Sequence, residues 1–186
     1  MGHLIDEDPS ASDLSRAWMR AAETAVIADA LRGVYSEVAA EIARRGPSCW
    51  ASGRCCNFDK AGHRLYVTGL EAAYALAQLP VLRVDDPVLT LPQLGDARAR
   101  GGCPFQVSNL CGIHTIKPLG CRVYFCDRSA QDWQHELTES GLRRIRAIHD
   151  QFDVPYRYGE WRGMLEMLRG WDMGSGNGEV GNQIGT

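Results

Sequence analysis

The stretch DLSRAWMRAAETAVIADALRGVYSEVAAEIARRGP, residues 13–47, sets the character of the fold. Its apolar side chains recur every three or four positions, which places them along one face of an α-helix. Ser12 or Asp13 can cap the start of this helix, and Gly46-Pro47 ends it. The pattern predicts either one long helix or two shorter helices that bend at Gly33. The apolar positions are Leu14, Trp18, Ala22, Ala25, Ile27, Leu31, Val34, Val38 and Ile42.

Three more helices are predicted after this stretch. Thr68-Gly69-Leu70-Glu71 fits a capping box, in which the Thr68 and Glu71 side chains each bond a backbone amide. A helix is therefore expected over about 69–79, ending near Pro80. Gly141 lies on the apolar face of the next helix and would let a neighbouring helix come close. The last two helices are defined by Trp133, Leu137, Ile145, Ile148 and Phe152, and then by Trp161, Met164, Leu165 and Leu168.

The segments between these helices are short or irregular. Residues 64–67 read as an extended piece, and residues 80–101, with three prolines, predict a connection without regular structure. Residues 104–107 and 122–125 suit a small hairpin or irregular loops better than a helix. We therefore predict a mainly α fold: a small helical domain with two cysteine-bearing loops and at most a short β-hairpin.

Length and charge exclude several classes of protein. The 186 residues suit a single domain, 1–186, with residues 1–11 and the glycine-rich residues 171–186 as flexible ends. A net charge of −3 lacks the basic excess typical of proteins that bind nucleic acid. No segment approaches the ~20 apolar residues of a membrane helix, and the acidic N-terminus lacks an apolar signal core. We expect a cytoplasmic protein that binds neither nucleic acid nor a membrane.

Every cysteine of the chain falls in one of two segments, 49–56 and 103–126. In a reducing compartment, dense cysteines indicate metal or redox chemistry rather than stable disulfides. Seven is also an odd number, so a scheme of disulfides alone would leave one thiol over. The candidate metal ligands are Cys49, Cys55, Cys56, Cys103, Cys111, Cys121 and Cys126.

The residues around the cysteines suit thiolate ligation. Thiolates bind zinc and iron strongly, and short loops let several sulfurs converge on one centre. Glycines in both segments permit tight turns and leave amides free to point at sulfur. Positive charge beside the thiols lowers their pKa, and neighbouring aromatic rings can shield the site from water. The glycines are Gly53, Gly112 and Gly120; the cations are Arg54, Lys117 and Arg122; the aromatics are Trp50, Phe105, Tyr124 and Phe125.

These motifs resemble the YkgJ-type cysteine-cluster family, which is described as a zinc- or iron-chelating domain. That family shows Cys-x-x-Cys-Gly-x-Cys-Cys, later Cys-Pro-Phe, then Cys-x-Ile-Tyr/His, Arg/Lys-Pro, Cys-Arg and a final Cys. The match covers residues 49–126 and keeps the order and local spacing of the motifs. In this chain they fall on Cys49, Ser52, Gly53, Cys55 and Cys56, on Cys103-Pro104-Phe105, on Cys111, Ile113 and His114, on Lys117-Pro118, and on Cys121-Arg122 and Cys126.

Ser52 departs from the family pattern, because it stands where the family has its second cysteine. A serine hydroxyl is a poor metal ligand at neutral pH, so this ligand position is either dispensable or altered. Seven thiols still exceed the four that one zinc ion or one cluster requires. We therefore expect either one metal site with four thiolate ligands and spare cysteines, or a two-metal site.

Spacing and resemblance favour iron over zinc. Cys103-Pro104 is similar to the Cys-Pro that closes bacterial ferredoxin motifs. The wide intervals along Cys103–Cys111–Cys121–Cys126 lack the paired short spacing of zinc ribbons, in which two to four residues usually separate the ligands. The cysteine cluster is also similar to that of flagellin lysine N-methylase, which looks like an iron–sulfur protein. We expect an iron–sulfur cluster, most consistent with 4Fe-4S; zinc is the alternative, and copper or no metal stays open.

The sequence leaves three kinds of function open. The first is a non-enzymatic metal-cluster protein with a structural, electron-transfer or metal-handling use. The second is an enzyme, as the methylase resemblance implies, although the chain shows no phosphate-binding loop, dinucleotide fingerprint or nucleophile elbow. The third is a thiol redox module at Cys55-Cys56. His114 is expected to have a structural role. The expected partner is a metal ion or cluster, and a redox or protein partner is left open and unidentified.

Overall fold

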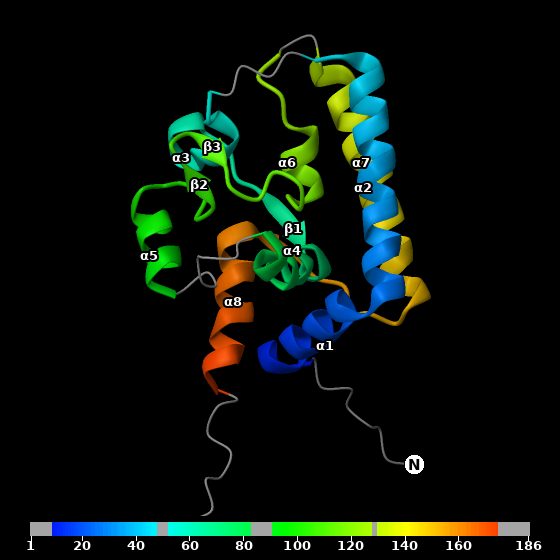
Figure 1. Ribbon diagram of the computed structural model, residues 1–186, viewed down its shortest axis with the longest axis vertical. Helices are drawn as coiled ribbons and strands as arrows, with labels where there is room; N and C mark the ends of the chain where they lie inside the picture. Colours follow the sequence, from blue (N-terminus) through cyan, green and yellow to red (C-terminus); the bar gives the residue numbers. More distant parts are fainter. Residues whose placement is uncertain (1–8, 48–51, 83–90, 128–129, 175–186) are drawn as a thin grey trace, which may run out of the picture.

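The structure is a computed structural model that describes residues 9–47, 52–82, 91–127 and 130–174. Within these ranges the chain is mainly helical, which confirms the predicted fold class (Figure 1). None of the helices in them is both long and apolar enough to cross a membrane. The α-helices are α1 (Ala11–Glu23), α2 (Ala25–Arg45), α3 (Phe58–Ala61), α4 (Gly69–Leu82), α5 (Leu91–Ala99), α6 (Leu119–Val123), α7 (Gln131–Gln151) and α8 (Trp161–Gly174), and η1 (Arg54–Cys56) is a 3-10 turn.

The first predicted helix is divided at Thr24 rather than bent at Gly33. Thr24 has extended backbone angles, φ −75° and ψ 115°, and its hydroxyl donates to the carbonyl of Arg20 at 2.8 Å. The chain therefore turns between α1 and α2, while Gly33 lies inside α2. Helix α1 also begins earlier than predicted, because Ser10, not Ser12 or Asp13, accepts the amide of Asp13 as the N-cap. Gly46 ends α2 in the left-handed conformation, as expected.

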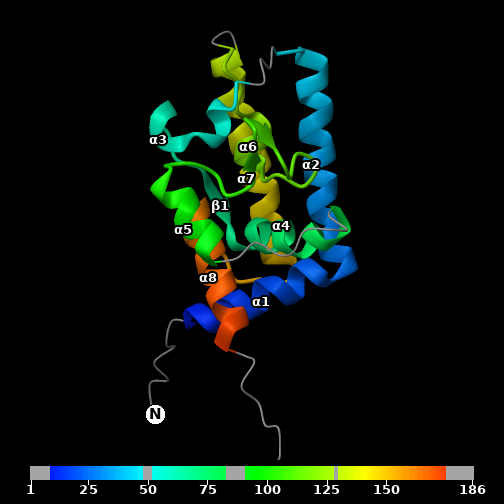
Figure 2. The same ribbon diagram turned by 60° about the vertical axis from the view of Figure 1, so that its left-hand side comes forward.

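Helix α4 lies at the centre of the molecule in both views (Figures 1 and 2). Its residues Ala72, Ala73 and Ala75 are all fully buried, so the helix is covered on several sides. Helix α1 packs against it through the buried Trp18, whose indole Nε1 donates to the carbonyl of Pro155 at 2.7 Å. This packing explains the small residues in α4, which let neighbouring helices approach closely.

Two long helices, α2 and α7, run antiparallel along one side of the molecule (Figure 1). Arg144 of α7 forms an ion pair with Glu37 of α2, and the Arg45 guanidinium lies 5.1 Å from the ring centre of Trp133. Gly141 of α7 lies beneath Leu119 of α6, where an added Cβ would be 2.8 Å from the Leu119 methyl groups. The prediction that Gly141 admits a neighbouring helix is confirmed.

The described residues form two small antiparallel ladders. Strands β2 (Gln106–Val107) and β3 (Leu110–Cys111) make the predicted hairpin through Ser108 and Asn109, with positive φ angles of 49° and 65°. Such angles are those of a two-residue hairpin turn of type I′. The second ladder was not predicted: β1 (Tyr66–Thr68) pairs with the distant β4 (Tyr158–Glu160). Strands of three residues are too short for alternation of apolar and polar side chains to be recognised in the sequence.

Several predicted boundaries were wrong. Residues 91–99, expected in an irregular connection, form α5, where Pro92 stands in the first turn and needs no helical amide bond. Helix α4 continues through Pro80, with only two helical residues after it. Arg122 and Val123 belong to α6, not to a hairpin. At the predicted flexible ends, α1 starts at residue 11 and α8 runs to residue 174, while residues 1–8 and 175–186 lie outside the described ranges.

Candidate metal centre

The six described cysteines lie on elements that surround one corner of the fold, and all are free thiols. Two belong to η1 in the first segment, and the other four lie in or beside the hairpin and α6 in the second. Cys49 and Trp50 lie outside the described residues. The six cysteines are Cys55 and Cys56 on η1, Cys103 before β2, Cys111 at the end of β3, Cys121 in α6 and Cys126 after α6.

Backbone hydrogen bonds join the two cysteine segments. The amide of Cys103 donates to the carbonyl of Cys56 at 2.7 Å, and the Gln106 side chain donates to the carbonyl of Gly53 at 3.2 Å. Gly53 has φ +69°, and an added Cβ would lie 2.8 Å from the Gln106 Nε2 and 3.1 Å from the Asn109 carbonyl oxygen. The hairpin therefore packs directly on the turn before η1, and only glycine fits there.

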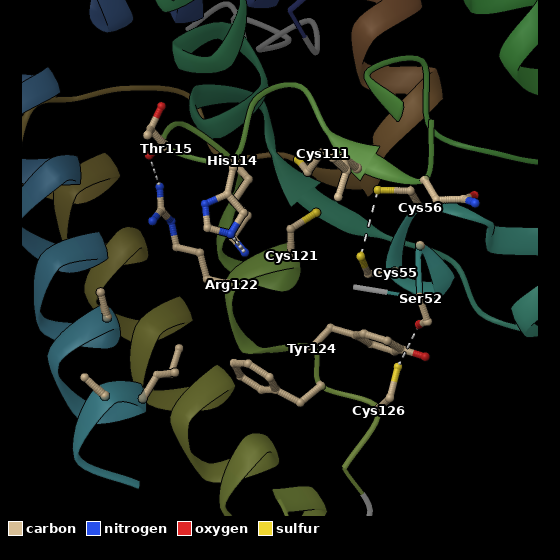
Figure 3. A pocket seen from close by; sticks show the side chains of 18 residues that line it. Ser52, Cys55, Cys56, Cys111, His114, Thr115, Cys121, Arg122, Tyr124 and Cys126 are labelled. Carbon is tan, nitrogen blue, oxygen red and sulfur yellow. Dashed lines mark hydrogen bonds between the residues drawn. The ribbon is translucent and has the colours of Figure 1, made fainter. Parts of the chain in front are cut away.

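The thiols of the two segments come into contact. The Sγ atoms of Cys55 and Cys56 are 3.9 Å apart, and the Cys56 thiol also hydrogen-bonds with Cys103 and Cys111. Figure 3 shows Cys55, Cys56, Cys111 and Cys121 side by side. The 55–56 and 103–121 sulfurs, which are 47 to 66 positions apart in sequence, thus share one corner.

Five cysteines line a single pocket of about 550 Å³: Cys55, Cys56, Cys111, Cys121 and Cys126. The opposite wall is apolar and comes from Ala39, Ile42 and Ala43 of α2. The sequence did not predict that α2 would line the same pocket as the cysteines. Cys103 lies behind the pocket and is 4% exposed. In the part of the chain that the structure describes, no three His, Cys, Asp or Glu side chains are arranged to hold a metal ion.

Ser52 and Cys126 both line this pocket and lie next to each other. Its Oγ lies 3.5 Å from the Cys126 Sγ, a hydrogen-bonding contact that Figure 3 marks with a dashed line. The position at which the resembled family has a cysteine is therefore next to the last cysteine of the second segment. The hydroxyl replaces one potential thiolate with a neutral hydrogen-bonding group.

The thiols differ in acidity because their surroundings differ. The pKa of Cys55 and that of Cys111 are lowered to about 6 each, mainly by hydrogen bonding with Cys56 and to a smaller extent by the charge of Lys117, while burial opposes the shift. The pKa of Cys56 is raised, first by its hydrogen bonds with Cys103 and Cys111. Burial raises the pKa of Cys121 well above its ordinary value. The corner thus combines thiols that ionise readily with thiols that need a metal to displace their protons.

Two backbone amides point at sulfur in the same local geometry. The amide of Phe105 donates to the thiol of Cys103, and the amide of Ile113 donates to the thiol of Cys111. In each case the donor lies two residues after the cysteine, and the bond favours the thiolate by lowering the pKa. This agrees with the expectation that the loops aim amides at sulfur.

The predicted cations and aromatics divide into two groups. Lys117 and Arg122 line the pocket with Tyr124 and Phe125. Phe105 instead packs in the core, with its ring centre 5.8 Å from that of Trp161, and Arg54 is exposed and does not line the pocket. His114 also lines the pocket: its Nε2 lies 3.3 Å from the Lys117 Nζ. The charge of Lys117 is the main cause that lowers the pKa of His114, which favours the neutral ring, and a neutral ring can accept a hydrogen bond from the ammonium group.

A buried carboxylate, Glu71, positions α6. The sequence predicted its role in the capping box but not its contact with α6. Within the predicted capping box its Oε2 accepts the amide of Thr68 at 3.0 Å, while the Thr68 hydroxyl accepts the amide of Glu71 at 3.2 Å. Its other oxygen accepts the amide of Leu119 at 2.8 Å and the hydroxyl of Tyr35 at 3.2 Å. The capping signal gave no hint of this long-range bond, which holds the first turn of α6 and hence Cys121.

Comparison with known proteins adds no relative: no family model, curated protein or solved structure matches this chain. The resemblance to the YkgJ-type family stays a prediction that rests on the motif residues.

Proposed function

We propose that this chain is a thiolate metal-binding protein that holds an iron–sulfur cluster, most consistent with 4Fe-4S, at the corner where the two cysteine segments meet. The observation that carries the proposal is the pocket lined by five cysteines from two distant segments. The donor set fits such a group, because thiolates are the usual ligands of iron–sulfur clusters and of structural zinc. When bound, the cluster would supply electron transfer or a structural crosslink.

The hydrogen bonds to sulfur support a metal centre over a chance grouping of buried thiols. Bonds from the amides of Phe105 and Ile113 stabilise thiolate rather than thiol, which a purely apolar role for cysteine would not need. The charges of Lys117 and Arg122 would offset the negative charge of a thiolate-bound site. We take Cys55, Cys56, Cys111 and the remaining pocket cysteines as the ligand candidates, with Cys49 and Cys103 as further candidates.

The proposal favours iron–sulfur over zinc on the spacing of the cysteines and the size of the pocket. A zinc ion with Zn–S bonds of about 2.3 Å fills a sphere of roughly 50 Å³, far less than the pocket of about 550 Å³. A cytoplasmic location goes with this proposal, because free thiols persist in a reducing compartment.

The deciding experiment is purification without oxygen, followed by elemental analysis and visible absorption. We expect iron and sulfide in comparable amounts and a broad absorption band in the visible range. A colourless protein with stoichiometric zinc and no iron would eliminate the cluster and leave the zinc alternative. Protein that carries neither metal, and takes up neither on reconstitution, would refute the proposal as a whole.

A variant series assigns the metal to this corner. We expect Cys111→Ser and Cys121→Ser to lose metal and thermal stability together, because the free energy of metal binding becomes folding free energy when the site exists only in the native state. Leu168→Ala on α8 is the matched control: Leu168 is 2% exposed, and its truncation costs about 2–5 kcal/mol without touching the pocket. It should lose stability and keep its metal. Full metal content and an unchanged melting temperature in both cysteine variants would contradict the assignment.

A further inference from the structure

We infer that Trp161, at the start of α8, is a positioning residue for the metal centre, because its indole N–H holds the sulfur of Cys103 in place as a thiolate ligand. The inference rests on the proposed metal function and adds to it a residue that lies outside both cysteine segments. Three observations carry it: the indole is buried, its N–H has no close acceptor, and the sulfur of Cys103 lies within its reach.

The fold fixes Trp161 beside the second cysteine segment. Trp161 follows β4 directly, and its backbone amide donates to the carbonyl of Leu65 at 2.9 Å, so the β1–β4 ladder sets the position at which α8 begins. Its side chain is completely buried, and its ring centre lies 5.8 Å from that of Phe105. Phe105 is two residues after Cys103. Core packing therefore holds the indole against the Cys-Pro-Phe motif.

The indole N–H has no close acceptor. Among the described residues, the buried Nε1 of Trp161 has no hydrogen-bond partner of ordinary length, and the acceptor within its reach is the sulfur of Cys103. Trp18 is completely buried as well, but its Nε1 donates to the carbonyl of Pro155 at 2.7 Å. A buried tryptophan N–H usually finds a partner, and a buried donor without one is unfavourable. The N–H of Trp161 is thus an unsatisfied donor directed at a candidate metal ligand.

Metal binding would give this donor a better acceptor. The sulfur of a protonated thiol accepts hydrogen bonds weakly, whereas the negative charge of a thiolate strengthens them. The sulfur of Cys103 already accepts the amide of Phe105 and bonds with the thiol of Cys56. When a metal displaces the proton of Cys103, the indole gains a stronger acceptor at the same position. A ring that only filled the core would not need this N–H.

Cys103 is the cysteine for which such positioning matters. It is 4% exposed and does not line the pocket, and it meets the other thiols through Cys56, whose carbonyl accepts the Cys103 amide at 2.7 Å. A sulfur behind the pocket can serve as a ligand only if its direction is fixed. Hydrogen bonds to a ligand sulfur also draw off negative charge, which favours the reduced state of an iron–sulfur cluster. Trp161 would therefore both orient Cys103 and raise the reduction potential.

The test compares Trp161→Phe with Trp18→Phe, because each removes an indole N–H from a completely buried ring. Both variants should lose stability. Zinc affinity of the reduced protein is measured by competition with a chromophoric chelator, and Trp161→Phe should weaken it by about tenfold or more, as is typical when a partner of a metal ligand is removed. Trp18→Phe should leave the affinity unchanged. After reconstitution with iron and sulfide, only Trp161→Phe should shift the reduction potential, and the shift should be negative.

A second measurement uses the wild-type chain, so it does not depend on whether Trp161→Phe folds. The protein is loaded with an NMR-active cadmium isotope, and the indole proton of Trp161 is identified by its contact with the ring of Phe105. We expect a scalar coupling between this proton and the metal, which can pass only through an N–H···S hydrogen bond to a metal-bound sulfur. The indole proton of Trp18 should show none, because it is bonded to a carbonyl.

The outcomes separate this inference from the metal proposal. If the wild type binds metal but the Trp161 indole proton shows no coupling to cadmium, the inference is wrong and the metal centre stands. Equal zinc affinity and equal reduction potential in the wild type and Trp161→Phe would also overturn it. An equal loss of zinc affinity in Trp161→Phe and Trp18→Phe would do the same, because the effect would then be one of stability alone. A wild-type protein that takes up no zinc, cadmium or iron would refute both proposals.

Discussion

Substitution of Gly69 by alanine should destabilise the protein, and its outcome tests the packing on which the site rests. Gly69 begins α4, directly beneath the indole of Trp18. An added Cβ would lie 2.5 Å from the Cε3 of Trp18 and still nearer to two other ring carbons. Carbon atoms in contact prefer about 3.5–4.0 Å, so the ring would have to move by at least about 1 Å.

The indole has no room for that movement. Trp18 is completely buried, and its Nε1 is fixed to the carbonyl of Pro155 at 2.7 Å. Displacement of the ring should therefore cost about as much as the loss of its packing, roughly 3–5 kcal/mol. Replacement of glycine by alanine in a helix recovers up to about 1 kcal/mol. We expect a net loss of about 2–4 kcal/mol in the free energy of unfolding.

Urea unfolding followed by circular dichroism measures this loss, with Gly33→Ala as the matched control. Gly33 also lies in a helix, but an added Cβ there meets nothing within 4 Å. The control should stabilise the protein by about 0.5–1 kcal/mol through helix propensity and reduced chain entropy. The two glycine-to-alanine changes thus have opposite predicted signs. If Gly69→Ala is as stable as the wild type or more stable, the packing argument is wrong.

Three other predictions concern the carboxylate, the hairpin and a surface ion pair. Burial raises the pKa of Glu71 above its ordinary 4.5, so the native state binds this proton more tightly and the free energy of unfolding falls as the pH rises above 4.5 and through the native pKa. Urea titrations should show the wild type losing stability relative to Glu71→Gln over this range. Gly53→Ala should weaken metal retention in a chelator competition assay, because the new Cβ would push Gln106 and the hairpin away from η1. Glu166→Gln should change stability by less than about 1 kcal/mol, although Glu166 bonds Arg98 at 2.5 Å and 2.6 Å, because both side chains are exposed.

The sequence predicts the presence of the helices in this fold better than the residues at which they begin and end. Regular apolar spacing and the capping box of Thr68 correctly indicated the helices that carry the core. The break at Thr24 was missed because a threonine is not a strong helix breaker, and its extended conformation follows from how α1 packs on α4. Helix α5 was missed because prolines normally predict a connection, whereas Pro92 is tolerated in a first turn.

The candidate site was only partly accessible from sequence. Clustering of the cysteines in two segments predicted which thiols to consider, and the structure brings six of the seven to one corner. The contribution of α2 was not predictable, because Ala39 and Ile42 look like ordinary helix positions and reach the thiols only through tertiary packing. For the same reason Glu71 looked like a helix cap, while its bond to Leu119 joins residues 48 positions apart.

The shared carboxylate of Glu71 has a consequence for how a metal group could enter the protein. Because one side chain secures both the start of α4 and the start of α6, the α6 side of the corner cannot swing outward unless the core loosens with it. The hairpin is tied to η1 by a single side-chain bond, from Gln106 to the carbonyl of Gly53, and its Val107 and Leu110 are 57% and 60% exposed. We therefore expect loading and release of a metal group to displace the β2–β3 hairpin more readily than α6.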